Sequence, residues 1–206
     1  MYILREGDEP MELPVDKLKE NVFDDICFSR CIFTNLDMRH STYMNCDFRY
    51  AETKCTLFNY SNFEKSRLIL MESAMADYSK ANLKSTLIIS SDFSGGSLNG
   101  ADLTGSTLSN VNFNFCDLRG AILECEGLDT CTFDNAVYDD STVWSLGFKP
   151  NLFGAKLISS SYFNDASSND NVAKHLLHYY GNEDLEILIV HPFYSAVVPS
   201  FSQYDL

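Results

Sequence analysis

Histidine and cysteine pairs are the residues of this sequence whose spacing could support metal or redox chemistry. His175 and His178 lie three residues apart, so on a helix they would share one face and could offer two ligands to a metal ion. Cys27 and Cys31 could form a similar pair. Because no third ligand follows at a metal-site spacing, we interpret these histidines as surface or interface residues and predict no metal and no cofactor.

The run Ser94-Gly95-Gly96-Ser97 is superficially similar to a phosphate-binding loop. Such a loop needs a following helix and a lysine to hold the phosphates, and neither follows here. The sequence also contains no Ser-His-Asp series and no carboxylate pair in a recognisable catalytic frame. We therefore predict that the protein is not an enzyme.

Negatively charged residues cluster late in the chain. No Lys or Arg occurs between Arg119 and Lys149. An ordinary solvated acidic end explains this pattern, and so does a docking surface for a basic partner. The candidate partner-binding residues are Glu124, Glu126, Asp129, Asp134, Asp139 and Asp140.

The net charge of the whole chain limits the kind of partner. The sequence has 29 Asp and Glu against 15 Lys and Arg, a formal charge of -14. Direct binding to nucleic acid requires Lys and Arg to neutralise phosphates, so the composition argues against it. A basic protein, including one that itself binds DNA, remains compatible with this charge.

A five-residue repeat must position all of these side chains. From Phe23 to Val143 every fifth residue is large and apolar except Thr53 and Ser73, and the register contains no insertion. Two positions before each of these residues, most repeats carry a small residue. This period matches neither a helix nor a strand, so we predict that one side chain in five points inward beside a bend of the chain.

Several segments have the form of a known repeat. They are Ala81-Asn82-Leu83, Ala101-Asp102-Leu103, Cys46-Asp47-Phe48 and Cys116-Asp117-Leu118. The pattern resembles the pentapeptide-repeat family, whose consensus is Ala-(Asp/Asn)-Leu-X-X. The resemblance implies an all-β fold, a right-handed quadrilateral β-helix with four pentapeptides in each coil. Residues twenty apart would then stack at about 4.8 Å, in about six coils.

The repeat divides the chain into three predicted parts. Residues 1–20 form an N-terminal cap, in which Val15–Glu20 could make a helical turn. Residues 21–145 form the β-helix, and residues 146–206 form a capping segment and an irregular tail with a short helix at residues 171–180. Trp144, the only tryptophan, is suited to closing the open end of the coil.

Cysteine usage and hydropathy indicate the compartment. The seven cysteines are odd in number, and the N-terminus lacks the features of a signal peptide. No apolar run approaches the length of a membrane span. We expect a cytoplasmic protein with reduced thiols, in which Cys31 and three others fill the small inward positions while Cys125 points outward. By the same register Glu126 falls in a small inward position, where a charge is costly.

An apolar patch is expected on the outside of the coil. Ile69 and Ile89 each follow an inward residue and lie twenty apart, so they should stack on one outer face with Leu70 and Leu87 beside them. Contiguous outward apolar residues usually mark an interface. Either the C-terminal tail or another chain could cover them, and a homodimer through the tail or through this face is one outcome.

The family resemblance implies two functions. Most members have no assigned biochemical role, so the first is the broad class of a non-catalytic interaction solenoid that binds an unidentified protein partner through one face. Some members resemble a DNA duplex in width and charge and bind type II topoisomerases, chiefly DNA gyrase. The alternative is therefore a DNA mimic that binds gyrase and modulates or protects it. Neither function requires nucleic acid or a membrane.

Overall fold

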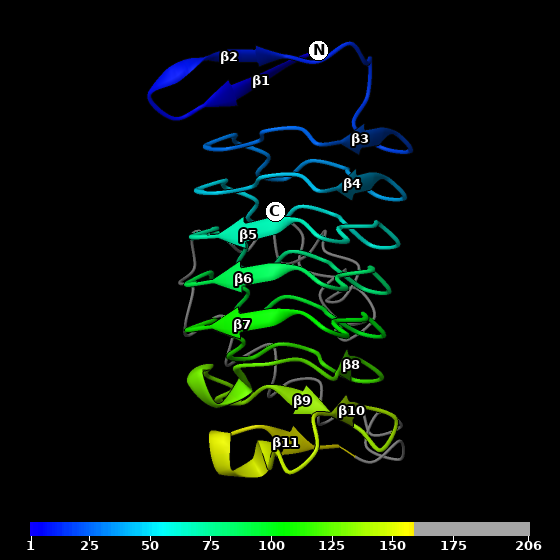
Figure 1. Ribbon diagram of the computed structural model, residues 1–206, viewed down its shortest axis with the longest axis vertical. Helices are drawn as coiled ribbons and strands as arrows, with labels where there is room; N and C mark the ends of the chain where they lie inside the picture. Colours follow the sequence, from blue (N-terminus) through cyan, green and yellow to red (C-terminus); the bar gives the residue numbers. More distant parts are fainter. Residues whose placement is uncertain (159–206) are drawn as a thin grey trace, which may run out of the picture. The chain divides into compact units, whose positions relative to one another are not determined.

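The computed structural model describes residues 1–158, which include the compact unit Met1–Leu157. This unit is a right-handed quadrilateral β-helix of about seven turns, which confirms the predicted fold (Figure 1). Its parallel strands are β3 (Val22–Asp24), β4 (Thr42–Met44), β5 (Arg67–Ile69), β6 (Leu87–Ile89), β7 (Thr107–Ser109), β8 (Ile122–Leu123), β9 (Val137–Tyr138), β10 (Val143–Trp144) and β11 (Lys156–Leu157). Two 3₁₀ turns, η1 (Leu128–Thr130) and η2 (Pro150–Phe153), lie near its C-terminal end.

Each corner of the coil is a residue in the left-handed backbone region. Every fifth residue from Glu20 to Gly120 has a φ between 49° and 68°, and most of these residues are not glycine. L-residues resist this conformation, so the surrounding contacts must hold it. The hydrogen bonds between coils supply that restraint: Phe33 N–H donates to Glu52 O at 2.7 Å and Asn35 N–H donates to Lys54 O at 3.0 Å.

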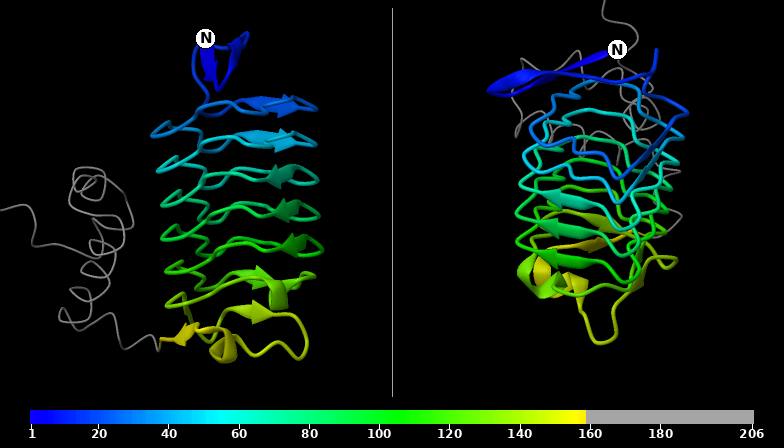
Figure 2. Two further views of the ribbon diagram at one scale, coloured as in Figure 1. Left: turned by 90° about the vertical axis from the view of Figure 1, so that its left-hand side faces the viewer. Right: turned by 45° about the horizontal axis from the view of Figure 1, so that its top comes forward.

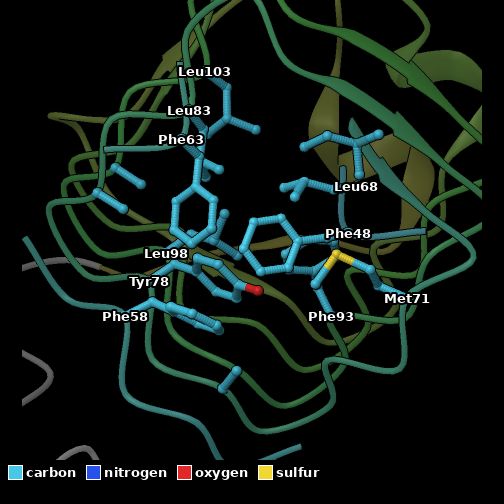
Figure 3. Packing of buried hydrophobic residues seen from close by; sticks show 14 of the residues in the cluster. Phe48, Phe58, Phe63, Leu68, Met71, Tyr78, Leu83, Phe93, Leu98 and Leu103 are labelled. Atoms are coloured by element: carbon cyan, nitrogen blue, oxygen red, sulfur yellow. The ribbon is translucent and has the colours of Figure 1, made fainter. Parts of the chain in front are cut away.

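The core is a set of columns formed by the inward side chains. The predicted inward residues from Phe23 to Phe133 are all buried, with at most 5% of their surface exposed. Aromatic rings contact one another from coil to coil: Phe93 and Phe113 are tilted with ring centroids 5.7 Å apart, and Phe113 and Phe133 are stacked with ring centroids 5.4 Å apart. Figure 3 shows how inward side chains such as Phe48, Phe63 and Tyr78 fill the interior of the middle coils. Stacked apolar columns of this kind stabilise the solenoid one coil at a time.

Two polar residues interrupt one column, and the structure pairs them. Thr53 Oγ1 donates to Ser73 Oγ at 2.8 Å, and Ser73 Oγ lies 2.8 Å from Tyr78 Oη. Met71 is also buried, in the small position of the Ser73 repeat. The size of Thr53 alone would predict loose packing at this position. The structure instead places its hydroxyl in a buried, hydrogen-bonded group of three, which removes the cost of an unpaired polar atom.

The N-terminal cap is a β-hairpin and not the expected helical turn. Strand β1 (Tyr2–Arg5) pairs antiparallel with β2 (Asp8–Glu12). Ile32 N–H donates to Leu4 O at 2.8 Å, and Glu6 N–H donates to Arg30 O at 2.9 Å. The hairpin thereby covers part of the open edge of the first coil (Figure 2). Residues 15–20 contain turns and bends, because backbone partners on the coil outweigh a weak helical preference.

The register slips at the C-terminal end of the coil. Strand β10 pairs Val143 with Ile122 and Trp144 with Leu123, so Trp144 occupies the level predicted for Val143. Val143 is 41% exposed, and its predicted place in the core is therefore wrong. The ring of Trp144 packs edge-on against Phe133 and Tyr138. The predicted tail helix at residues 171–180 lies outside the described residues.

Candidate interaction surfaces

Five of the six predicted partner-binding carboxylates are exposed on the last coils. Glu124, Glu126, Asp129, Asp134 and Asp140 are exposed and Asp139 is partly buried. The chain turns a corner about every five residues, so these residues lie on successive faces of the coil. We call Glu124, Glu126, Asp129 and Asp134 the acidic belt. Closeness in sequence therefore spreads the belt over three successive faces of the coil and does not gather it in a patch on one side.

Glu126 does not occupy the small inward position that the register predicted for it. Glu126 pairs with Thr107, nineteen residues away, where regular coils pair at twenty. Cys125 takes the small position instead and is only 9% exposed, so the expectation that it points outward is also wrong. The repeat before Cys125 has four residues and the repeat after it has six. Together they span the length of two regular repeats, so the overall register is kept. In the regular register the carboxylate of Glu126 would be buried. The shift buries the thiol of Cys125 in its place, and burying a thiol costs far less desolvation free energy than burying a carboxylate.

Gly127 makes this shift sterically possible. Its φ is 81°, and a Cβ added there would lie 1.9 Å from the carbonyl oxygen of Leu108. A side chain at this position would therefore collide with the backbone of the coil before it. Glycine tolerates both the close approach and the left-handed conformation, and turn η1 follows at once.

A surface cavity of about 390 Å³ opens beside the shifted residues. It is lined by Gly105, Thr107, Glu124, Cys125, Glu126, Ser145 and Leu146. Two carboxylates of the acidic belt thus share a hollow with Leu146, whose side chain is fully exposed. Acidic and aliphatic walls together are suited to the side chain of a lysine or arginine, which has an apolar stem and a charged end.

Asp139 is engaged within its own turn. Its Oδ1 accepts hydrogen bonds from Gly120 N–H at 3.1 Å, from Ser141 N–H at 3.0 Å and from the Ser141 hydroxyl at 2.6 Å. Burial raises the pKa of Asp139, but hydrogen bonds from Ser141, Gly120 and Thr142 outweigh this effect and hold the pKa below its usual value. These hydrogen bonds hold the carboxylate of Asp139 against the neighbouring backbone, where it closes the turn between β9 and β10.

The predicted apolar patch lies on the sheet formed by β5, β6 and β7. Ile69 stacks on Ile89 through paired backbone positions, and both side chains are partly buried along with Leu87. Leu70 is 42% exposed at the adjoining corner. We call this side of the coil the β6 face; Figure 1 shows its three strands one above another. The sequence located the patch because a twenty-residue spacing is one full coil.

An exposed stack of side chains was not anticipated from the sequence. The rings of His40 and Tyr60 are stacked at 5.0 Å, and Lys80 Nζ lies 5.2 Å from the centre of the Tyr60 ring. The three residues occupy successive coils at one corner, twenty residues apart. The same spacing rule that located Ile69 and Ile89 would have found them. Such contacts stabilise the corner modestly.

The predicted metal and redox candidates fall in different places. His175 and His178 lie outside the described residues. All seven cysteines are free thiols, with Cys27 exposed and Cys31 buried in its small position. Burial raises the pKa of the Cys31 thiol to about 11. Within residues 1–158 no three His, Cys, Asp or Glu side chains gather as a metal site would require, and no helix there is long and apolar enough to cross a bilayer.

Comparison with known proteins agrees with the repeat. The family model described as pentapeptide repeats matches residues 88–124 with 8 copies. A search of curated proteins finds no match.

Several solved structures are similar. One is alr5209, a pentapeptide repeat protein from Nostoc Pcc 7120: it is 21% identical with a TM-score of 0.42, over 47% of this chain and 84% of that one. A pentapeptide repeat protein from the Arabidopsis thaliana thylakoid lumen is 20% identical with a TM-score of 0.34, over 52% of this chain and 67% of that one.

A trypsin-treated variant of QnrB1, a plasmid-mediated fluoroquinolone resistance protein, is 18% identical with a TM-score of 0.25, over 75% of this chain and 95% of that one. The five-residue register and the twenty-residue pairing of the coils are features of this chain itself, and the family match covers residues 88–124. The chain therefore contains pentapeptide repeats.

Proposed function

We propose that the protein is a non-catalytic interaction solenoid that binds a basic protein through the acidic belt. The observation that carries this proposal is the one-signed charge of the last coils. Glu124, Glu126, Asp129 and Asp134 are exposed there, and no Lys or Arg occurs between Arg119 and Lys149. The proposal includes a cytoplasmic location, which is compatible with the free thiols.

The cavity beside Glu126 is the proposed anchoring point. A lysine or arginine of the partner would lay its stem against Leu146 and place its charge between Glu124 and Glu126. Buried contacts at the centre of an interface contribute most of the binding free energy, whereas exposed charge pairs mainly accelerate association. Asp139 has a structural role in this proposal because its carboxylate is held within its own turn.

A type II topoisomerase such as DNA gyrase is the second candidate partner. The observation in its favour is that the acidic belt extends over three faces of the coil, as phosphates extend around a duplex. An enzyme that closes around DNA would meet negative charge on several faces of this rod and not on one. A partner with a single flat basic surface would instead contact only two or three of these carboxylates.

The test compares the wild-type protein with a variant carrying Glu124→Gln, Glu126→Gln and Asp129→Asn. Proteins captured by the wild type but not by the variant would be purified and titrated with both at two salt concentrations. We expect the variant to bind about 10-fold to 100-fold more weakly, with the difference shrinking at high salt because exposed charges are screened. Equal, salt-insensitive affinities for every captured protein would refute the acidic-belt proposal.

The matched control is a variant that neutralises the same number of charges elsewhere: Glu52→Gln, Glu64→Gln and Glu72→Gln. It should bind like the wild type if the belt, and not net charge, determines affinity. Purified gyrase tests the second candidate separately. Wild-type protein should inhibit supercoiling in competition with duplex DNA; absence of both binding and inhibition would exclude gyrase and leave the first proposal standing.

A further inference from the structure

The four carboxylates of the acidic belt have no partner within residues 1–158. There, none of these side chains forms a salt bridge or accepts a hydrogen bond. Carboxylates of the coil before them are paired: Asp102 lies 2.9 Å from Lys84 Nζ, and Asp117 lies 2.7 Å from Arg119 Nη2. The charges of the belt are therefore available to a binding partner, which can form charge-assisted hydrogen bonds with them.

The backbone of the belt is engaged by the neighbouring coil. Glu126 N–H donates to Ser106 O at 3.0 Å, and Leu108 N–H donates to Glu126 O at 2.9 Å. Gly105 N–H likewise donates to Glu124 O at 2.9 Å. These groups are not free to bind an added β-strand through its main chain. The side chains of a partner must therefore reach the carboxylates and the cavity.

The belt turns corners of the coil, which restricts the shape of the partner. Glu124 follows strand β8 on one face, and Glu126 bridges to Thr107 on the next. Asp134 lies on the face after that, where its N–H donates to Asn114 Oδ1 at 2.7 Å. A flat surface laid against a four-sided coil reaches one face and its corners. A partner that contacts the whole belt must bend around the coil, as an extended chain does.

The spacing of the carboxylates fits an extended chain with a basic residue at about every third position. The residues of the belt are two, three and five positions apart in the sequence. In the polyproline II conformation, which is common in unfolded chains, every third side chain points the same way, and these side chains recur about every 9 Å. The long, flexible stems of Lys and Arg accommodate the unequal intervals.

The cavity beside the belt sets the register of such a chain. Its volume is about 390 Å³, and Glu124, Glu126 and the exposed Leu146 line it. One Lys or Arg side chain can place its stem against Leu146 and its charge beside the two carboxylates. The next basic residues along the chain then lie over Asp129 and Asp134, on the following face.

We propose that the partner binds the acidic belt through an extended basic segment that bends around the last coils and carries Lys or Arg at about every third position. This inference rests on the proposed function and specifies which part of the partner is bound. Attraction between opposite charges accelerates the encounter, and the side chain in the cavity slows dissociation. A folded domain with a flat basic surface is the arrangement that the experiment must distinguish from it.

Fluorescence anisotropy of labelled peptides, titrated with the full chain, tests the proposal. One peptide has a lysine at every third position, separated by Gly and Ser; the other has the same composition with all its lysines in one block. We expect the spaced peptide to bind at least about tenfold more tightly at about 50 mM salt, and both to bind weakly at about 500 mM. Equal affinities for the two peptides would overturn the proposal.

Single substitutions along the belt test whether the segment bends around the coil. Glu124→Gln, Glu126→Gln and Asp134→Asn each neutralise a different face. Each should weaken binding of the spaced peptide at least about threefold, with the larger losses at the two residues that line the cavity. A partner confined to one face would leave at least one of these variants with wild-type affinity, and that result would contradict the bent arrangement.

The control variant combines Glu52→Gln, Glu64→Gln and Glu72→Gln and should bind the spaced peptide within about twofold of the wild type. Circular dichroism and thermal midpoints would establish that every variant is folded. Lysozyme, as a folded basic protein, separates this inference from the proposed function. If lysozyme binds through the belt and neither peptide does, the inference fails and the proposed function stands. If neither lysozyme nor any peptide or captured protein binds the belt, both fail.

Discussion

The regular coils between Asn21 and Gly120 differ from the coils that follow Ala121. In the regular coils the position of a residue within its pentapeptide decides whether its side chain is buried. After Ala121 the repeats have four, six and irregular numbers of residues, and burial follows the chemistry of individual side chains. The difference shows that the solenoid keeps its register only while each inward position receives a side chain that tolerates burial.

Both regions use the same hydrogen bonds between coils, so the backbone itself does not explain the difference. Leu103 N–H donates to Ile122 O, nineteen residues on, whereas Leu108 N–H donates to Glu126 O, eighteen residues on. One missing residue is accommodated there without loss of the bond. The acidic belt and the cavity both result from this local change, because it turns Glu126 outward beside Glu124.

The largest effect is expected from the regular region. Phe113→Ala should lower the free energy of unfolding by about 3–5 kcal/mol, because a fully buried ring that stacks on Phe93 and Phe133 is removed. Urea denaturation followed by circular dichroism would measure this change. A midpoint equal to that of the wild type would mean that this column does not support the fold.

A second prediction concerns the choice between Cys125 and Glu126. Cys125→Glu leaves a carboxylate at either candidate for the small position, so stability should fall by at least about 2 kcal/mol. Adding Glu126→Cys should recover most of the loss, because the thiol can then enter the small position in the regular five-residue register. If the double variant is as unstable as the single one, desolvation of Glu126 is not the cause of the shift. Denaturation curves of both variants give the comparison.

The close approach at Gly127 gives a smaller expected effect with a matched control. Gly127→Ala and Gly147→Ala each place Cβ on a residue with a φ above 80°, which costs about 1–2 kcal/mol. Only at Gly127 would Cβ meet backbone; at Gly147 no atom lies within 4 Å. We expect Gly127→Ala to cost at least about 1 kcal/mol more in thermal or urea unfolding. Equal losses of stability would show that a Cβ at Gly127 meets no more steric obstruction than a Cβ at Gly147.

The smallest predicted effect is the pH dependence contributed by Asp139. Because its pKa is lowered in the folded protein, the carboxylate stabilises the fold fully above the ordinary Asp value of about 3.9 and progressively less as the pH falls toward the lowered pKa. Asp139→Asn should therefore flatten the stability profile below about pH 4. Asp140→Asn removes the same charge from an exposed neighbour and should retain the wild-type profile. Thermal midpoints measured across this range would show a difference or exclude one.

The sequence by itself determined the repeat, the interior columns from Phe23 to Phe133 and the stacking of Ile69 on Ile89. These follow from spacing alone, because in a coil of four pentapeptides a residue's number gives both its face and its level. Only the tertiary structure decided three features. They are the N-terminal hairpin, the burial of Cys125 in the small position expected for Glu126, and the place of Trp144 at the level expected for Val143. In each case the outcome depends on a balance between desolvation, steric contact and hydrogen bonds with the adjoining coil, which a count of five residues does not contain.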